Sequence, residues 1–177
     1  MKIKHLFPIV LVLALSTFTS CDLFDKADDV NFDVVLPLEF VIDENEDNPE
    51  GASYSDSQLL DATSNPDVAE YANKIKEFKV DRITYTISSA DPTSVTFTGG
   101  TLQVASNSQI IATASAVSLN NSAETDLTAN LDGFNDLAAR LLDDKQETVL
   151  LNGTLSETPV EFHVTFKFYI RITADAL

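Results

Sequence analysis

Two long segments of this chain alternate between apolar and polar residues, and this alternation restricts the fold more than any other feature. Every second residue is apolar in both: Val30, Phe32, Val34, Leu36, Leu38, Phe40 and Ile42 in the first, and Val160, Phe162, Val164, Phe166, Phe168, Ile170 and Ile172 in the second. Successive side chains of a β-strand point to opposite faces of the sheet, so a period of two predicts a strand with one buried face. We therefore expect two long strands whose apolar faces share one core.

A two-residue hairpin turn is predicted at Gly99-Gly100, because glycine supplies the positive φ angles that such turns require. This turn would place Val95 opposite Val104 on one apolar face. Pro37 predicts that the first long strand lies at a sheet edge or carries a bulge, since proline donates no hydrogen bond.

A second hairpin is predicted over residues 156–159, with Leu155 opposite Val160. Further strands are expected near 80–88 and 110–119, where β-branched and apolar residues predominate.

Two short amphipathic helices are expected between the strands. The first begins at Asn65-Pro66, a typical N-cap followed by a first-turn proline. The second has Asp132 as its candidate cap and one apolar face formed by Phe134, Leu137, Ala138 and Leu141. Two such helices are too few to cover a parallel sheet, so we predict a mainly β fold, an antiparallel β-sandwich with two short helices. The alternative is an α+β fold, an antiparallel sheet with both helices on one face.

The acidic segment from Asp43 to Gly51 is the candidate metal site. Oxygens of Asp43, Asn45 and Asp47 have the alternate spacing that lets a loop wrap Ca²⁺. The segment resembles the start of an EF-hand loop, but it has Asn48 where that family has glycine. The alternative is a solvated acidic loop with no cofactor, because charge runs are usually solvated.

The polar face of the last long strand holds the other candidate groups. His163 is the only histidine after the N-terminal segment, and we expect an ordinary surface residue there. Lys167 and Arg171 are expected to pair with acidic residues of a neighbouring strand, with an anion-binding stripe as the alternative.

Composition excludes several function classes. The chain has 28 acidic and 11 basic residues and a net charge of −17, which opposes nucleic-acid binding because that requires cations to neutralise phosphate. The sequence contains no Gly-x-Ser-x-Gly turn to present a nucleophile and no tryptophan to stack a sugar. We therefore expect no enzyme and assign no catalytic residue, with a carboxylate-based enzyme as the alternative.

The N-terminus has the pattern of a secretory signal. Lys2 and Lys4 precede the apolar stretch 6–15, and a run of small residues leads to Ser20 and Cys21. A cysteine at the cleavage site resembles the lipobox of bacterial lipoproteins, whose type II signal peptide is removed before the cysteine is acylated. This resemblance implies that residues 1–20 are removed and that lipidated, palmitate-bearing Cys21 holds the protein to a membrane.

The acidic segment that follows resembles the export segment of Bacteroidota surface lipoproteins, which combines lysine with acidic residues. It implies a lipid-anchored cell-envelope protein, at the outer membrane and surface-exposed. The alternatives are a solvated tether without an export role and, as in enterobacterial lipoproteins with an aspartate after the cysteine, retention at the inner membrane through Asp22. The domain boundaries are then a signal peptide at 1–20, an acidic tether at 21–29 and a single β-rich domain at 30–177. We recognise no family resemblance in residues 22–177.

The expected function is a non-catalytic binding or structural role with a protein partner encoded nearby. The alternative is a carrier of an apolar ligand in a cavity between the sheet and the helices.

Overall fold

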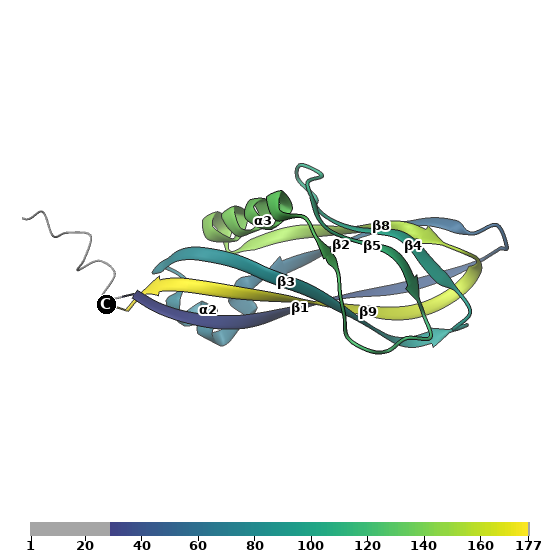
Figure 1. Ribbon diagram of the computed structural model, residues 1–177, viewed down its shortest axis with the longest axis horizontal. Helices are drawn as coiled ribbons and strands as arrows, with labels where there is room; N and C mark the ends of the chain where they lie inside the picture. Colours follow the sequence, from purple (N-terminus) through teal and green to yellow (C-terminus); the bar gives the residue numbers. More distant parts are fainter. Residues whose placement is uncertain (1–28, 177) are drawn as a thin grey trace, which may run out of the picture.

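The computed structural model describes residues 29–176, in which two antiparallel sheets face each other across one core (Figure 1). Sheet A has the order β1 (Asp29–Asn48), β9 (Thr158–Asp175), β3 (Ile75–Asp91) and β6 (Thr125–Asp126). Sheet B has the order β2 (Ala52–Asp61), β8 (Gln146–Leu155), β4 (Thr96–Val104), β5 (Ile110–Ser118) and β7 (Thr128–Ala129). The prediction of an antiparallel β-sandwich is confirmed. Asp29, which we assigned to the tether, is the first residue of β1.

The two long alternating segments are β1 and β9, and they are neighbours in sheet A. Leu36 lies opposite Phe168 and Phe32 lies opposite Ile172. The alternating apolar side chains of β9 from Val160 to Ile172 are buried, as is every second side chain of β1 from Val34 to Ile42: Val34, Leu36, Leu38, Phe40 and Ile42. Pro37 therefore lies in an edge strand, as predicted, since β1 pairs only with β9 among the described strands.

Two helices and a 3₁₀ turn complete the described chain. The 3₁₀ turn η1 (Ala62–Ser64) leads into α2 (Pro66–Tyr71), where the Asn65 side chain accepts hydrogen bonds from the N–H groups of Asp67 and Val68 as an N-cap. The second helix is α3 (Leu131–Asp144).

The predicted cap of α3 is wrong. Asn130 caps the helix by accepting the Gly133 N–H, and Asp132 lies in the first turn. Both residue types cap well, so the capping signal alone does not decide between positions two residues apart. The buried face of α3 includes Phe134, Leu137 and Leu141, as predicted.

The hairpin predicted at Gly99-Gly100 is also wrong, because both glycines lie inside the single strand β4. Thr98 pairs with Thr154 and Thr101 with Asn152, so two residues of β4 oppose one of β8. Gly99 has a φ of 60°, as expected for a β-bulge of this kind. The bulge shifts the buried positions from odd to even numbers along the strand, as a two-residue turn would have done. Val95 and Val104 are both buried but are not paired.

The hairpin predicted over residues 156–159 is wrong as well, since β8 and β9 belong to different sheets. The side chains of Leu155 and Val160 are both buried in the core, but they belong to opposite sheets. The connection therefore crosses from one side of the sandwich to the other.

The sandwich is elongated, and its two ends differ (Figure 1). At the proximal end, on the left, β1 begins and β9 ends; at the distal end, on the right, β1 turns into β2 and β8 continues into β9. Helix α3 contacts β3 of sheet A and β5 and β8 of sheet B, so it closes the space between the sheets towards the proximal end.

One long side of the sandwich is closed by a segment that we call the strap (residues 119–130). Its β6 pairs with β3 in sheet A, and its β7 pairs with β5 in sheet B. The strap therefore links the two sheets at one side, whereas β1 and β2 are the edge strands of the other side.

Candidate functional site

The outer face of sheet A contains most of the polar chemistry predicted from sequence. His163 lies on β9 with its side chain 31% exposed, and its Nδ1 is 2.9 Å from Glu39 Oε1 on the neighbouring β1. This contact ties two adjacent strands together. Within residues 29–176 this is the one hydrogen bond of the His163 ring.

Arg171 is the centre of a proximal ion-pair cluster. Its guanidinium lies 3.3 Å from Asp33 Oδ1 on β1 and 3.1 Å from Asp81 Oδ2 on β3. Beside this cluster the Arg82 guanidinium lies 4.0 Å from the centre of the Tyr169 ring. A surface depression of about 250 Å³, open to solvent, has Asp33, Asp81, Arg82 and Tyr169 in its lining. The prediction that Arg171 pairs with acidic residues of neighbouring strands is confirmed.

Glu124 of the strap binds three side chains of sheet A. Its carboxylate accepts hydrogen bonds from Lys167 Nζ at 2.7 Å, Tyr169 Oη at 2.6 Å and Thr84 Oγ1 at 2.8 Å. These hydrogen bonds, the one from Lys167 first, lower the pKa of Glu124 to about 2. Lys167 therefore pairs with an acidic residue as predicted, although that residue comes from the strap.

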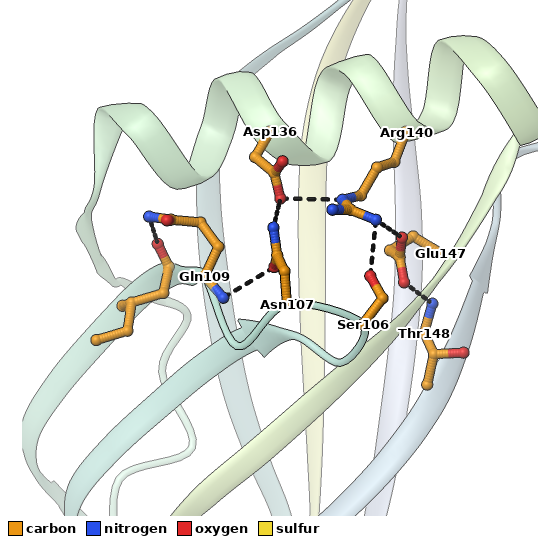
Figure 2. A network of polar contacts seen from close by, with 8 residues as sticks. Ser106, Asn107, Gln109, Asp136, Arg140, Glu147 and Thr148 are labelled. Atoms are coloured by element: carbon orange, nitrogen blue, oxygen red, sulfur yellow. Dashed lines mark hydrogen bonds and ion pairs between the residues drawn. The ribbon is translucent and has the colours of Figure 1, made fainter.

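A second polar network fastens α3 to sheet B (Figure 2). The Arg140 guanidinium contacts Asp136 at 3.0 Å, Glu147 at 3.3 Å and Ser106 Oγ at 2.7 Å. Asn107 donates a further hydrogen bond to Asp136 at 3.0 Å. Burial raises the pKa of Asp136, but the bonds from Arg140 and Asn107 outweigh burial and hold that pKa below its usual value. Helix, loop and strand are thus joined through one guanidinium, an arrangement that serves structure.

The candidate calcium ligands lie in the distal part of β1, which is extended where we predicted a loop. Asp43, Asn45 and Asp47 are exposed, and Asn45 Nδ2 donates a hydrogen bond to Asp43 Oδ1 at 2.8 Å. At about 3.3 Å per strand residue the outer two lie about 13 Å apart, so binding one ion between all three would require this segment to bend. No three histidine, cysteine, aspartate or glutamate side chains of residues 29–176 are grouped so that they could hold a metal. The calcium site stays a prediction.

Charge is segregated along the molecule, a feature that we did not predict. All the lysines and arginines of residues 29–176 lie in the proximal part of β3 and the segment before it, on α3 and its C-cap, or in the proximal half of β9: Lys74, Lys76, Lys79, Arg82, Arg140, Lys145, Lys167 and Arg171. The sequence signal for it was the absence of lysine and arginine from residue 27 to residue 73.

The distal end is correspondingly rich in uncompensated carboxylates. Within the described part of the chain, eight acidic residues there form no ion pair: Asp43, Glu44, Glu46, Asp47, Glu50, Asp91, Glu157 and Glu161. On adjacent strands Glu161 lies opposite both Asp43 and Asp91. Like charges in such pairs destabilise a sheet unless a cation lies nearby.

Between the sheets lies an apolar pocket with a volume of about 30 Å³. Its lining includes Phe97, Leu151, Phe162 and Phe166. A pocket for a ligand of drug size has about 300 Å³ or more, so this space is of the size of a packing void.

Cys21 lies outside the described residues. No helix between residues 29 and 176 has the length and hydropathy needed to span a membrane.

Comparison with known proteins finds no similar sequence and only weak structural similarity. No protein-family model and no curated protein matches this chain. Among solved structures it is similar to a decameric BFDV capsid protein, with 7% identity and a TM-score of 0.47 over 81% of this chain and 99% of the other. It is also similar to Desmodium yellow mottle tymovirus, with 17% identity and a TM-score of 0.41 over 84% of each chain. At these values neither likeness bears on function.

Proposed function

We propose that this chain is a lipid-anchored protein of the cell envelope whose sandwich binds a partner or has a structural role without covalent chemistry. The observation that carries the proposal is the lipobox-like pattern ending at Cys21. Acyl chains on that cysteine would hold the protein stably, because two or more chains together bind a bilayer much more tightly than one.

The position of the first strand supports this proposal. Only seven residues separate Cys21 from Asp29, where β1 begins. At about 3.5 Å per residue at full extension, the proximal end would lie within about 28 Å of the acylated sulfur. The distal end would then point away from the lipid. Because the segment after Cys21 resembles the export segment of Bacteroidota surface lipoproteins, the proposal extends to the outer membrane.

Surface binding is favoured over the carrier alternative. A carrier would need an enclosed pocket of a few hundred cubic ångströms, and the apolar space between the sheets measures about 30 Å³. The outer face of sheet A, by contrast, displays charged and aromatic groups such as Arg82, Tyr169 and Arg171.

Replacement of the anchor tests the proposal. Cys21→Ala in the full chain should leave the domain folded and release it from the membrane fraction, and labelled palmitate should be incorporated only into the wild type. Circular dichroism would check the fold of the variant. Retention of Cys21→Ala in the membrane fraction, or label on it, would contradict the lipid anchor.

The absence of covalent chemistry has a separate test. His163→Ala should change no activity that the purified chain shows, because the imidazole hydrogen-bonds only to Glu39 among the described residues. The proposal would be wrong if the purified protein turned over a substrate and a single aspartate or glutamate substitution abolished that turnover without unfolding the protein. Such a result would show that the protein is an enzyme.

A further inference from the structure

The edge of β1 is the most extensive unpaired strand edge in the described chain. The strand has 20 residues and pairs with β9 on one side only. The strap covers part of the opposite edge of sheet A through β6, but no described strand pairs with the outer side of β1. An edge strand presents unpaired backbone N–H and C=O groups, which can accept one more antiparallel strand.

The side chains along this edge combine apolar and acidic groups. Val35 is 41% exposed and Val41 is 51% exposed, and they are two of the four large apolar residues that are exposed among residues 29–176. Glu39 and Asp43 flank Val41 on the same face of the strand, because successive side chains alternate. A partner strand that alternates apolar and cationic residues would match this order.

The charge of the strand specifies the sign of its partner. It contains seven carboxylates and no basic residue: Asp29, Asp33, Glu39, Asp43, Glu44, Glu46 and Asp47. Asp29 and Asp33 pair with Lys76 and Arg171, and Glu39 lies against the His163 ring, whereas the four from Asp43 onwards have no ion pair within residues 29–176. A second copy of this chain would bring seven carboxylates against seven, so self-pairing is disfavoured.

From these observations we propose that the distal half of β1 (residues 38–48) is a docking edge for an extended, lysine- or arginine-rich segment of a partner protein. The segment adds to sheet A as a new edge strand, its backbone pairs with β1, and its cations lie against the unpaired carboxylates. This proposal rests on the proposed binding role and names the chemistry of the partner. It also uses the end of the molecule that the anchor would leave exposed.

Binding of two synthetic peptides to the full-length protein in detergent tests the proposal. One is an alternating lysine–valine nonapeptide; the other alternates lysine with proline, which keeps the charge but cannot form a strand ladder. By titration calorimetry at low salt, the lysine–valine peptide should bind about tenfold more tightly or better, because only it can pair with the edge. Equal affinity for both peptides would show non-specific attraction of cations, and no binding of either would refute the docking edge.

A matched pair of double variants locates the site. Asp43→Lys with Asp47→Lys should weaken the lysine–valine peptide by about tenfold or more, since two facing carboxylates become repulsive. Asp143→Lys with Asp144→Lys makes the same change in net charge on the exposed end of α3 and should change the affinity by less than about threefold, because salt screens distant charges. Equal losses in both double variants would contradict a site on β1.

One further result separates this proposal from self-association of the chain. A wild-type protein that sediments as a dimer, and that the peptide does not dissociate, would make a second copy the occupant and overturn the proposal. Because the peptide assay is done in detergent, its outcome does not depend on the anchor. Failure of the Cys21→Ala experiment would therefore leave the docking edge standing, and failure of the peptide assay would leave the anchor standing.

Discussion

At the scale of single residues, Glu124 shows how one carboxylate joins two parts of the chain. It lies in the strap and accepts hydrogen bonds from β3 and β9 through Thr84, Lys167 and Tyr169. The ionised carboxylate accepts these hydrogen bonds better than the protonated carboxyl group does. The pKa of Glu124 therefore falls to about 2 from an ordinary value of 4.5. The attachment of the strap to sheet A should therefore depend on pH.

Glu124→Gln tests this dependence. A carboxyl whose pKa is lower in the folded than in the unfolded protein stabilises the fold fully above the unfolded pKa and loses that contribution as the pH falls through the folded pKa. The variant should thus be less stable than wild type at pH 7, and the difference should shrink between pH 4.5 and about pH 2. Urea unfolding across this range measures it.

Glu70→Gln is the control, because Glu70 is exposed on α2. It should unfold like wild type at every pH. A Glu124→Gln protein that equals wild type at pH 7 would show that the strap does not need this charge.

At the scale of elements, α3 depends on a close approach of its first turn to β5. A Cβ atom added at Gly133 would lie 1.9 Å from the carbonyl oxygen of Ile110 and 2.7 Å from Ile111 Cα. Only glycine permits this distance, since backbone atoms cannot move aside as a flexible side chain can. The helix is thus seated on the strand by a residue that is poor for helix formation.

Gly133→Ala should therefore destabilise the protein. Helix propensity alone would favour the alanine by up to about 1 kcal/mol, but overlap with packed backbone costs about 1–3 kcal/mol, and at 1.9 Å the overlap wins. Asn135→Ala, at an exposed position of the same helix, should be neutral or slightly stabilising. Urea unfolding compares the two, and a stabilised Gly133→Ala would contradict the close contact.

The same scale shows how far the sequence predicts this fold. Alternation identified β1 and β9 and their buried faces because it reports which side of a strand meets the core. It does not report which strand is the neighbour. At Gly99-Gly100 the buried positions change from odd to even residue numbers, and a hairpin turn and a β-bulge both produce this change. Leu155 and Val160 would both face the core whether their strands belonged to one sheet or to two.

The candidate site was predictable to a similar degree. The pairing of Lys167 and Arg171 with carboxylates followed from their positions on the polar face of a strand, but the strap that supplies Glu124 lies 43 residues away from Lys167 in sequence. The free edge of β1 required the order of strands in sheet A, which no local pattern contains.

At the scale of the whole molecule, the distal carboxylates give the calcium hypothesis its test. If Asp43, Asn45 and Asp47 bind Ca²⁺, the melting temperature should rise on addition of millimolar calcium. A site with a Kd of about 10⁻⁴ M would add about 1.4 kcal/mol, or roughly 3–5 °C for a domain of this size. Asp43→Ala should abolish the rise and Asp143→Ala should not; an unchanged melting temperature would leave a solvated acidic strand.

The position of β9 in sheet A determines when the sheet can form during synthesis of the chain. The first strand, β1, pairs only with β9 among the described strands, and β9 is completed only at residue 175. A chain emerging N-terminus first therefore cannot assemble sheet A until residues 158–175 are available, and pairing at such sequence separation is slow. The order of strands thus delays completion of sheet A until β9 is synthesised, and under the export that we propose this delay would keep the chain extended while it crosses a membrane.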